Sequence, residues 1–354
     1  MAMGWMRTGI ALAALLTAAA PAQVATNVPA PVANAKPVTI ERIKVHSPAL
    51  EGSLEGDSAA RDVMVVLPPG YGLNRSRRYP VLYALHGYSI GAEQWTREIH
   101  VPQTIEGAFA KGAGEFIVVL PDSKTVHNGS MYSSSVTTGD FETFIARDLV
   151  RYIDGHYRTL ADRRSRGLAG HSMGGYGTTR IGLKHPDVFG ALYMMSPCCL
   201  SARSAAQIDT AMIERLGKLT SPKQSEGLPF MDRATLASAA AWSPNPARAP
   251  LYLDLPVKDG AVQPDVLARW AANAPLAMVD QYVGNLRRYA AIAIDVGDRD
   301  GLRDDARTLH EALDRYRIAN SFEVYSGDHT SGVAGRFQDH VMPFFSEHLV
   351  GATK

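Results

Sequence analysis

The sequence has little cysteine and almost no excess charge of either sign. Only 2 of its 354 residues are Cys, which is too few for a disulfide-stapled scaffold. The 36 Lys and Arg nearly balance the 35 Asp and Glu, so the basic excess typical of nucleic-acid-binding proteins is missing. Because 46% of the residues are hydrophobic, intrinsic disorder is excluded as well. We therefore expect a folded chain of one large or two small domains, with no nucleic acid as partner.

Long hydrophobic runs are also missing. A short, positively charged start precedes an apolar run over residues 10–20, and Ala-Pro-Ala follows at 20–22. This pattern is typical of a secretory signal peptide, and the run is too short for a membrane anchor across about 30 Å of hydrocarbon. We expect a signal peptide over residues 1–22, a flexible Ala- and Pro-rich leader over 23–37, no membrane span, and a periplasmic or secreted protein. That compartment argues against NAD or ATP as cofactor, and no phosphate-binding Gly-rich loop is present.

From residue 38 onward, strand-like runs alternate with segments of helical period. Residues 80–85 and 116–120 are apolar throughout, as expected for strands buried on both faces of a parallel sheet. Residues 141–157 place apolar side chains 3 to 4 positions apart, which predicts a helix. Further strands are expected at 39–45, 62–67, 166–169, 191–195, 290–296 and 321–325, and helices after 172 and at 302–316 and 337–349. This alternation predicts an α/β domain over residues 38–350 with a mostly parallel, doubly wound sheet.

The alternation stops between residues 197 and 289. This segment contains helical stretches at 205–219, 233–241, 265–272 and 276–288, a short apolar run at 251–257, and many prolines. A structureless loop of this length would be unusual in a compact domain. We interpret it as a largely helical, cap-like insertion before the strand at 290–296.

The motif Gly170-His171-Ser172-Met173-Gly174 matches the G-x-S-x-G nucleophile elbow. A strand is predicted before it and a helix after it, which is the context that the elbow requires. The alternative is an ordinary turn between a strand and a helix. The elbow holds the serine hydroxyl above the sheet, and the helix that follows directs backbone N–H groups at the reacting centre. We therefore predict that Ser172 is a nucleophile.

A serine nucleophile needs a base and an acid, which follow it along the chain in this arrangement. His329 comes just after the last predicted strand and is the expected base. Asp300 and Asp298 compete as the acid in the loop after 290–296, and we favour Asp300. The same acidic loop does not fit an EF-hand, because Val296 and Arg307 occupy two ligand positions. No metal or organic cofactor is expected.

The oxyanion hole should combine two backbone N–H groups. One follows the nucleophile, at Met173, and the other lies in the loop after the strand at 80–85, at Tyr88. Two such donors lower the barrier to acyl transfer by several kcal/mol, on the order of magnitude found for similar sites.

The sequence resembles the putative esterase family, which includes feruloyl esterases, S-formylglutathione hydrolases and mycolyltransferases, in four motifs that occur in order: Leu85-His86-Gly87, Gly170 to Gly175, Gly297-x-x-Asp300 and Gly327-Asp328-His329. The resemblance implies an α/β-hydrolase fold, a triad of Ser172, His329 and Asp300, and an oxyanion hole at Tyr88 and Met173. It also suggests Trp95 and Tyr132 as substrate-binding residues, although both could simply pack. The signal peptide counts against S-formylglutathione hydrolase, whose substrate is cytosolic, and the insertion is longer than the family would suggest.

These observations together predict a serine carboxylic ester hydrolase that works through an acyl-enzyme. Its partner would be a small-molecule or carbohydrate-linked ester, and the sequence defines neither the acyl and alcohol groups nor the oligomeric state. Acyl transfer to a sugar or lipid hydroxyl, peptidase activity and a non-catalytic binding module are the alternatives. The adjacent Cys198 and Cys199 are interpreted as two buried or reduced thiols, with a strained vicinal disulfide as the alternative.

Overall fold

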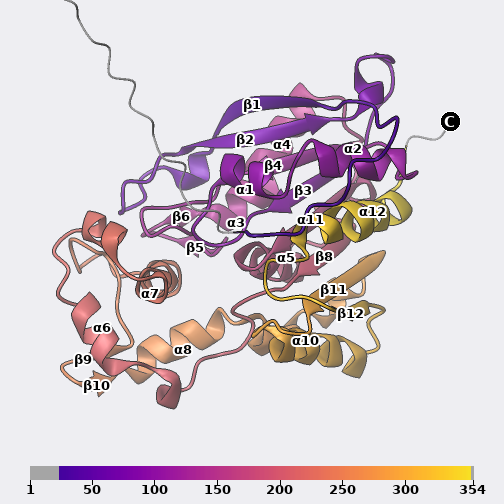
Figure 1. The fold of residues 1–354 in the computed structure, drawn as a ribbon. Coiled ribbons are helices and arrows are strands. Elements are labelled where there is room, and N and C mark those ends of the chain that lie inside the picture. The colour runs from indigo at the N-terminus through magenta and orange to yellow at the C-terminus, as the bar shows by residue number, and fades with distance from the viewer. Residues whose placement is uncertain (1–23, 352–354) are drawn as a thin grey trace, which may run out of the picture.

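A central sheet of eight strands organises the computed structural model, which describes residues 24–351 (Figure 1). The strand order is β1-β2-β4-β3-β7-β8-β11-β12. Only the pairs β1/β2 and β2/β4 are antiparallel, and the strands from β4 to β12 run parallel. The strands are β1 (Thr39–His46), β2 (Ala60–Leu67), β3 (Val81–Leu85), β4 (Ile117–Pro121), β7 (Arg166–His171), β8 (Ala191–Met195), β11 (Ala291–Gly297) and β12 (Ser321–Tyr325). The mostly parallel α/β-hydrolase sheet that the sequence predicts is confirmed.

Helices cover both faces of the sheet because its inner strands are apolar on both sides. Alternate residues of each strand enter two separate hydrophobic cores: in β3, Tyr83 joins one core and Leu82 the other. The first core contains residues of the helices α3 (Phe141–Thr143), α4 (Leu149–His156), α5 (Met173–Lys184) and α10 (Arg303–Arg315). The second contains residues of α1 (Ala92–Glu98), α2 (Gln103–Ala110), α11 (Val333–Arg336) and α12 (Met342–His348). The sheet is thus the middle layer of three, as expected for a doubly wound fold.

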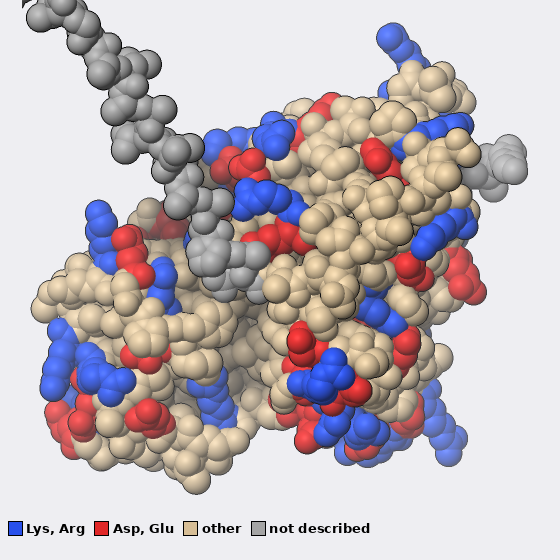
Figure 2. Space-filling model, in the orientation of Figure 1, with Lys and Arg blue, Asp and Glu red and all other residues tan. Residues whose placement is uncertain are grey.

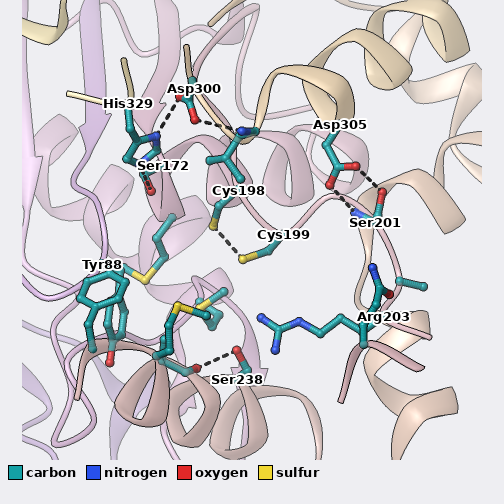
Figure 3. A pocket seen from close by; sticks show the side chains of 18 residues that line it. Tyr88, Ser172, Cys198, Cys199, Ser201, Arg203, Ser238, Asp300, Asp305 and His329 are labelled. Carbon is teal, nitrogen blue, oxygen red and sulfur yellow. Dashed lines mark hydrogen bonds and ion pairs between the residues drawn. The ribbon is translucent and has the colours of Figure 1, made fainter. Parts of the chain in front are cut away.

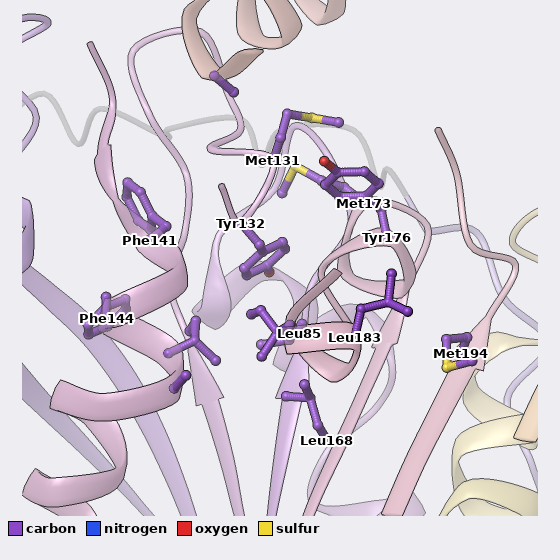
Figure 4. Close-up of a cluster of buried hydrophobic side chains, with 14 of the residues drawn as sticks. Leu85, Met131, Tyr132, Phe141, Phe144, Leu168, Met173, Tyr176, Leu183 and Met194 are labelled. Atoms are coloured by element: carbon purple, nitrogen blue, oxygen red, sulfur yellow. The ribbon is translucent and has the colours of Figure 1, made fainter. Parts of the chain in front are cut away.

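The first core supports the segment that carries Ser172. Figure 4 shows Met173, Tyr176 and Leu183 of α5 above Leu85 of β3 and Leu168 of β7. All five side chains are at most 1% exposed. The start of α5 therefore rests on close-packed side chains, and core packing of this kind resists displacement.

Two helical regions differ in detail from the sequence prediction. The helix expected over 141–157 is present, but residues Phe144–Asp148 form a π-helical turn between α3 and α4. The closing helix at 337–349 contains a similar turn at Phe337–Val341 between α11 and α12. A wider turn inside an otherwise regular helix accommodates one extra residue, which the apolar period does not reveal.

The insertion at 197–289 forms much of a separate lobe (Figure 1). Three of its predicted helices correspond to α6 (Thr210–Leu216), α7 (Phe230–Trp242) and α8 (Pro264–Ala272). The fourth, expected over 276–288, is wrong: this stretch forms two single 3₁₀ turns and the short α9 (Val283–Leu286). Its apolar side chains pack individually against the first core rather than along one helix face. Two-residue strand pairs complete the fold: β5 (Ser134–Ser135) with β6 (Gly139–Asp140), and β9 (Val257–Lys258) with β10 (Ala261–Val262).

The segment before β1 is bound to the domain. The predicted signal peptide lies outside the described residues, whereas residues 24–37 form no helix or strand but contact the body of the protein. Val24 is 5% exposed and donates its N–H to Glu98, and the N–H of Asn27 donates to the carbonyl of Ser331. The composition predicted a flexible leader; we correct that expectation, because these hydrogen bonds fix residues 24–27 beside the loop that carries His329.

Positive and negative side chains are interspersed on the face shown in Figure 2, in line with the balanced composition. Within residues 24–351, no helix has the length and apolar character needed to cross a bilayer.

Candidate active site

Ser172 lies at a sharp turn between β7 and α5. The strand ends at His171, the helix begins at Met173, and Ser172 between them has φ 57° and ψ −114°. A positive φ is costly for a residue with a side chain and is most often kept at functional sites. The turn fits because Gly170 and Gly174 face each other; a Cβ on Gly174 would overlap the carbonyl of Leu85. The nucleophile elbow predicted from the sequence has the expected backbone geometry.

Ser172, His329 and Asp300 form one hydrogen-bonded chain. The Oγ of Ser172 lies 2.9 Å from Nε2 of His329, and Nδ1 of the same ring lies 2.9 Å from Oδ2 of Asp300. A proton on Nδ1 donates to the carboxylate and leaves Nε2 free to accept the serine proton. The three residues come from three different loops at the carboxyl ends of β7, β11 and β12, and the structure brings them together as the sequence predicts.

Asp300 is held as the acid by its surroundings. Its side chain is 2% exposed, and its second oxygen accepts the N–H of Leu302 at 2.9 Å. Burial alone would raise the pKa of this carboxyl, but the hydrogen bond and the charge of His329 outweigh it and lower the pKa below its ordinary value. Asp298 accepts the N–H of Gly327 at 2.9 Å and pairs with Arg299 instead. Of the two candidate acids, only Asp300 contacts the imidazole.

His171, which sequence reasoning did not single out, positions the loop of His329. Its Nε2 lies 2.8 Å from the carbonyl oxygen of His329, and the two rings are 4.8 Å apart. Burial, followed by the nearby His329, lowers the pKa of His171 to about 3. The ring is therefore neutral and donates from Nε2. The motif alone does not reveal this role, because the residue before the serine is variable in G-x-S-x-G.

The loop after β3 passes directly beside the serine. A Cβ built on Gly87 would lie 3.5 Å from the Cβ of Ser172. His86 fixes this loop: its Nε2 accepts the N–H of Ser123 at 2.8 Å, and Nδ1 lies 2.8 Å from the carbonyl of Gly87. Burial lowers the pKa of His86, in keeping with a neutral ring. Backbone at Tyr88 and the first turn of α5 at Met173 thus lie on either side of the nucleophile, where the sequence predicts an oxyanion hole.

Two residues suggested as substrate contacts lie elsewhere. Trp95 is 1% exposed in the second core, where its ring packs edge-on against Phe337 at 6.2 Å. Tyr132 is fully buried, and its hydroxyl donates to the carbonyl of His86 at 3.0 Å. Neither lines the pocket at Ser172. We correct both expectations: Trp95 is a core residue, and Tyr132 supports the loop that carries Tyr88.

A pocket of about 470 Å³ opens above the triad (Figure 3). Apolar side chains dominate one wall, and the insertion supplies much of the lining. Phe230 of α7 packs edge-on against Tyr88 at 5.1 Å and is 56% exposed. The lining also includes the side chains Met131, Met173, Met231, Ala234 and Leu302. The cap-like insertion therefore meets the catalytic loops at this pocket.

Cys198 and Cys199 are free thiols that line the same pocket. The backbone N–H of Cys198 donates to the carbonyl of Ser172 at 3.1 Å, and the two sulfur atoms lie 2.8 Å apart. The thiol contact and burial raise the pKa of Cys198. Over residues 24–351, no group of three or more His, Cys, Asp or Glu side chains is arranged to hold a metal ion.

Comparison with known proteins places this site in context. The family model described as "Putative esterase" matches residues 58–354. The endo-1,4-beta-xylanase/feruloyl esterase of Xylanibacter ruminicola is 34% identical over 138 residues, which cover 37% of this chain and 19% of that protein. An esterase of Mycobacterium tuberculosis is 35% identical over 127 residues, or 35% of this chain and 26% of that protein. The matched segments thus span about a fifth to a quarter of these curated relatives.

Solved structures resemble the chain over most of its length. A ferulic acid esterase is 25% identical with a TM-score of 0.62, and the alignment covers 88% of this chain and 98% of that one. The S-formylglutathione hydrolase of Staphylococcus aureus is 16% identical with a TM-score of 0.56, covering 90% and 99%. The second likeness, at this low identity, shows the shared fold alone.

Proposed function

The chain belongs to the putative esterase family of α/β-hydrolases, and we propose that it hydrolyses carboxylic esters through an acyl-enzyme on Ser172. The observation that carries the proposal is the hydrogen-bonded chain from Ser172 through His329 to Asp300. This chain can take a proton from a serine hydroxyl while a carboxylate stabilises the resulting imidazolium.

In the first half of the reaction, the Oγ of Ser172 attacks the ester carbonyl carbon. Its proton passes to Nε2 of His329, and the carbonyl electron pair moves onto oxygen. The N–H groups of Tyr88 and Met173 stabilise this oxyanion. The intermediate then collapses: the bond to the alcohol oxygen breaks, and the leaving alcohol takes the proton from His329.

In the second half, water attacks the acyl-enzyme with His329 again as base. The proton returns to Oγ of Ser172 and the carboxylic acid is released. Asp300 stays ionised throughout and holds the imidazole in the reactive tautomer. Its lowered pKa supports this role.

The pocket favours a substrate with an apolar or aromatic part. Phe230, Met231 and Tyr88 offer such a part a ring edge and two flexible side chains. The xylanase/feruloyl esterase of Xylanibacter ruminicola and the solved ferulic acid esterase point the same way. We therefore include aryl acid esters among the proposed substrates.

We also propose that the protein acts in the periplasm or outside the cell. The proposal rests on the charged start, the apolar run and the Ala-Pro-Ala at 20–22. N-terminal sequencing of the exported protein should begin at Gln23, and an intact N-terminus would contradict it.

A burst experiment tests the catalytic proposal. With p-nitrophenyl acetate, the protein should release one equivalent of nitrophenol rapidly before steady turnover. Ser172→Ala should lower turnover by at least about a thousandfold. A fluorophosphonate probe should label the peptide that contains Ser172 in the native protein and not in the variant.

The matched control is Ser76→Ala, which removes a serine from an exposed turn. It should keep both the burst and the label. Unchanged turnover in Ser172→Ala, or labelling at another serine, would contradict the assigned nucleophile.

A further inference from the structure

Arg203 brings a positive charge into an otherwise apolar pocket. It lies in the insertion, after Cys199, and Figure 3 shows its guanidinium extending toward the space between Cys199 and Ser238. Within the described part of the chain, Arg203 is the only Lys or Arg that lines this pocket. A single cation in such a setting selects strongly among ligands, because charge interactions are strengthened where water is partly excluded.

The guanidinium has no carboxylate partner in the protein. Among residues 24–351, its side chain has no hydrogen bond or ion pair, and it lies over the ring of Trp270 at 5.6 Å. Asp305, which also lines the pocket, is occupied elsewhere: its carboxylate accepts the hydroxyl and the N–H of Ser201, at 2.6 and 3.3 Å. The donors of Arg203 are therefore available to a ligand.

The surroundings hold Arg203 in place rather than neutralise it. Trp270 is 2% exposed, donates its ring N–H to Ser243 at 2.9 Å, and packs edge-on against Trp242 at 5.7 Å. A fixed aromatic face beneath a guanidinium keeps the fork oriented while leaving its N–H edges free. The charge also reaches the pocket interior: the contact with Cys198 and, beyond it, Arg203 lower the pKa of Cys199, although burial opposes them.

We propose that Arg203 binds a carboxylate carried by the ester substrate, so that the preferred substrates are esters with one free carboxylate in addition to the ester group. The proposal rests on ester hydrolysis at Ser172. A planar carboxylate matches the guanidinium fork and can accept two parallel N–H bonds. The apolar wall at Phe230 and Met231 would then contact the uncharged part of the same molecule.

Matched pairs of esters test the proposal. One set has p-nitrophenyl hemi-esters of succinic, adipic and suberic acids, each beside the corresponding terminal amide, which has the same shape without the charge. The other set carries the charge on the leaving group: the acetyl esters of para-hydroxybenzoate and of para-hydroxybenzamide. For the best-fitting pair, kcat/KM should be about 10- to 100-fold higher for the carboxylate. The set in which this preference appears identifies the half of the ester that faces Arg203.

Substitution of Arg203 should abolish the preference without affecting the chemistry. Arg203→Gln should reduce kcat/KM for the carboxylate esters by the same 10- to 100-fold range, on the order of the lost charged hydrogen bonds, and change the amides by less than about twofold. Arg203→Lys, which keeps the charge, should retain part of the preference. Arg215→Gln is the matched control: Arg215 is in the same lobe, 61% exposed and paired with Asp232, so its loss should leave the preference intact.

Direct binding separates this proposal from the catalytic one. In the inactive Ser172→Ala protein, adipate should raise the melting temperature, and the additional change Arg203→Gln should remove that shift. If neutral esters are not hydrolysed by the natural protein, the catalytic proposal fails while adipate binding still tests Arg203. Equal rates for carboxylate and amide esters in both sets, or an equal loss for both in Arg203→Gln, would overturn the carboxylate site.

Discussion

Nδ1 of His329 lies 2.9 Å from Oδ2 of Asp300, while Asp298, two residues earlier, turns its carboxylate to the N–H of Gly327. This difference predicts distinct outcomes for two equivalent substitutions. Asp300→Asn should lower kcat by about a thousandfold or more, because an amide no longer fixes the reactive tautomer of the imidazole. Steady-state kinetics with p-nitrophenyl acetate measures the loss.

Asp298→Asn is the control in the same loop. The asparagine keeps an oxygen that can accept the N–H of Gly327, so kcat should change by only a few fold. A greater loss of kcat in Asp298→Asn than in Asp300→Asn would reverse the assignment of the acid.

The sequence predicted the triad because each member belongs to a local pattern. Ser172 lies in a five-residue turn motif, and Asp300 and His329 follow strands whose apolar runs are recognisable. Parallel strands bring such loops to one edge of a sheet. The choice between Asp300 and Asp298 depended on which carboxylate reaches the imidazole, and only the three-dimensional structure shows that distance.

The support beneath the oxyanion loop gives a second prediction. The hydroxyl of Tyr132 donates to the carbonyl of His86 at 3.0 Å, and its ring packs where a Cβ on Gly177 would overlap it. Tyr132→Phe should lower the free energy of unfolding by about 1 kcal/mol, the usual contribution of one hydrogen bond. It should also lower kcat with little change in KM, by less than the roughly hundredfold loss of a whole oxyanion donor.

Kinetics and urea unfolding of Tyr132→Phe test these effects together. A purely structural role would lower stability and leave kcat unchanged. A rise in KM at constant kcat would instead return Tyr132 to the substrate-binding role that the sequence suggested.

Close packing at the elbow gives a third prediction. A Cβ on Gly174 would overlap the backbone carbonyl of Leu85, which cannot move without disturbing β3. Gly174→Ala should therefore lower the free energy of unfolding by about 3 kcal/mol and shift the start of α5 away from Ser172. Urea unfolding followed by circular dichroism measures the change.

Gly155→Ala supplies the comparison on another helix. Gly155 lies within α4, and an added Cβ would meet nothing within 4 Å. Alanine there should stabilise the protein by about 0.5 to 1 kcal/mol, because it is the better helix former. Similar effects of the two substitutions would contradict the packing argument.

Contacts between distant segments were less accessible to sequence reasoning. Trp95 and Tyr132 were suggested by resemblance, yet burial in the two cores decides their roles. Arg203 lies in the insertion, where the periodic patterns were weakest and one predicted helix was wrong. Its importance depends on the side of the chain to which the guanidinium points and on the ring of Trp270 beneath it, and neither leaves a signal in residue spacing.

The neutral, buried His171 gives the last prediction, which concerns acid stability. Burial and His329 lower its pKa to about 3, whereas an unfolded histidine has a pKa near 6.5. Between these values the unfolded chain binds the extra proton, so stability is lost as the pH falls through this window. The slope from this residue approaches about 1.4 kcal/mol per pH unit. His171→Gln removes the titrating group and keeps an N–H donor for the carbonyl of His329.

Urea unfolding of the natural protein and His171→Gln at pH 7 and pH 5 tests this slope. The natural protein should be the more stable at pH 7, and its advantage should shrink by about 2 kcal/mol at pH 5. Other buried histidines titrate equally in both proteins, so their contributions cancel in the difference. His156→Gln, which removes an exposed histidine, should show a gap that does not change with pH. A constant gap for His171→Gln as well would show that His171 is not held neutral beside His329.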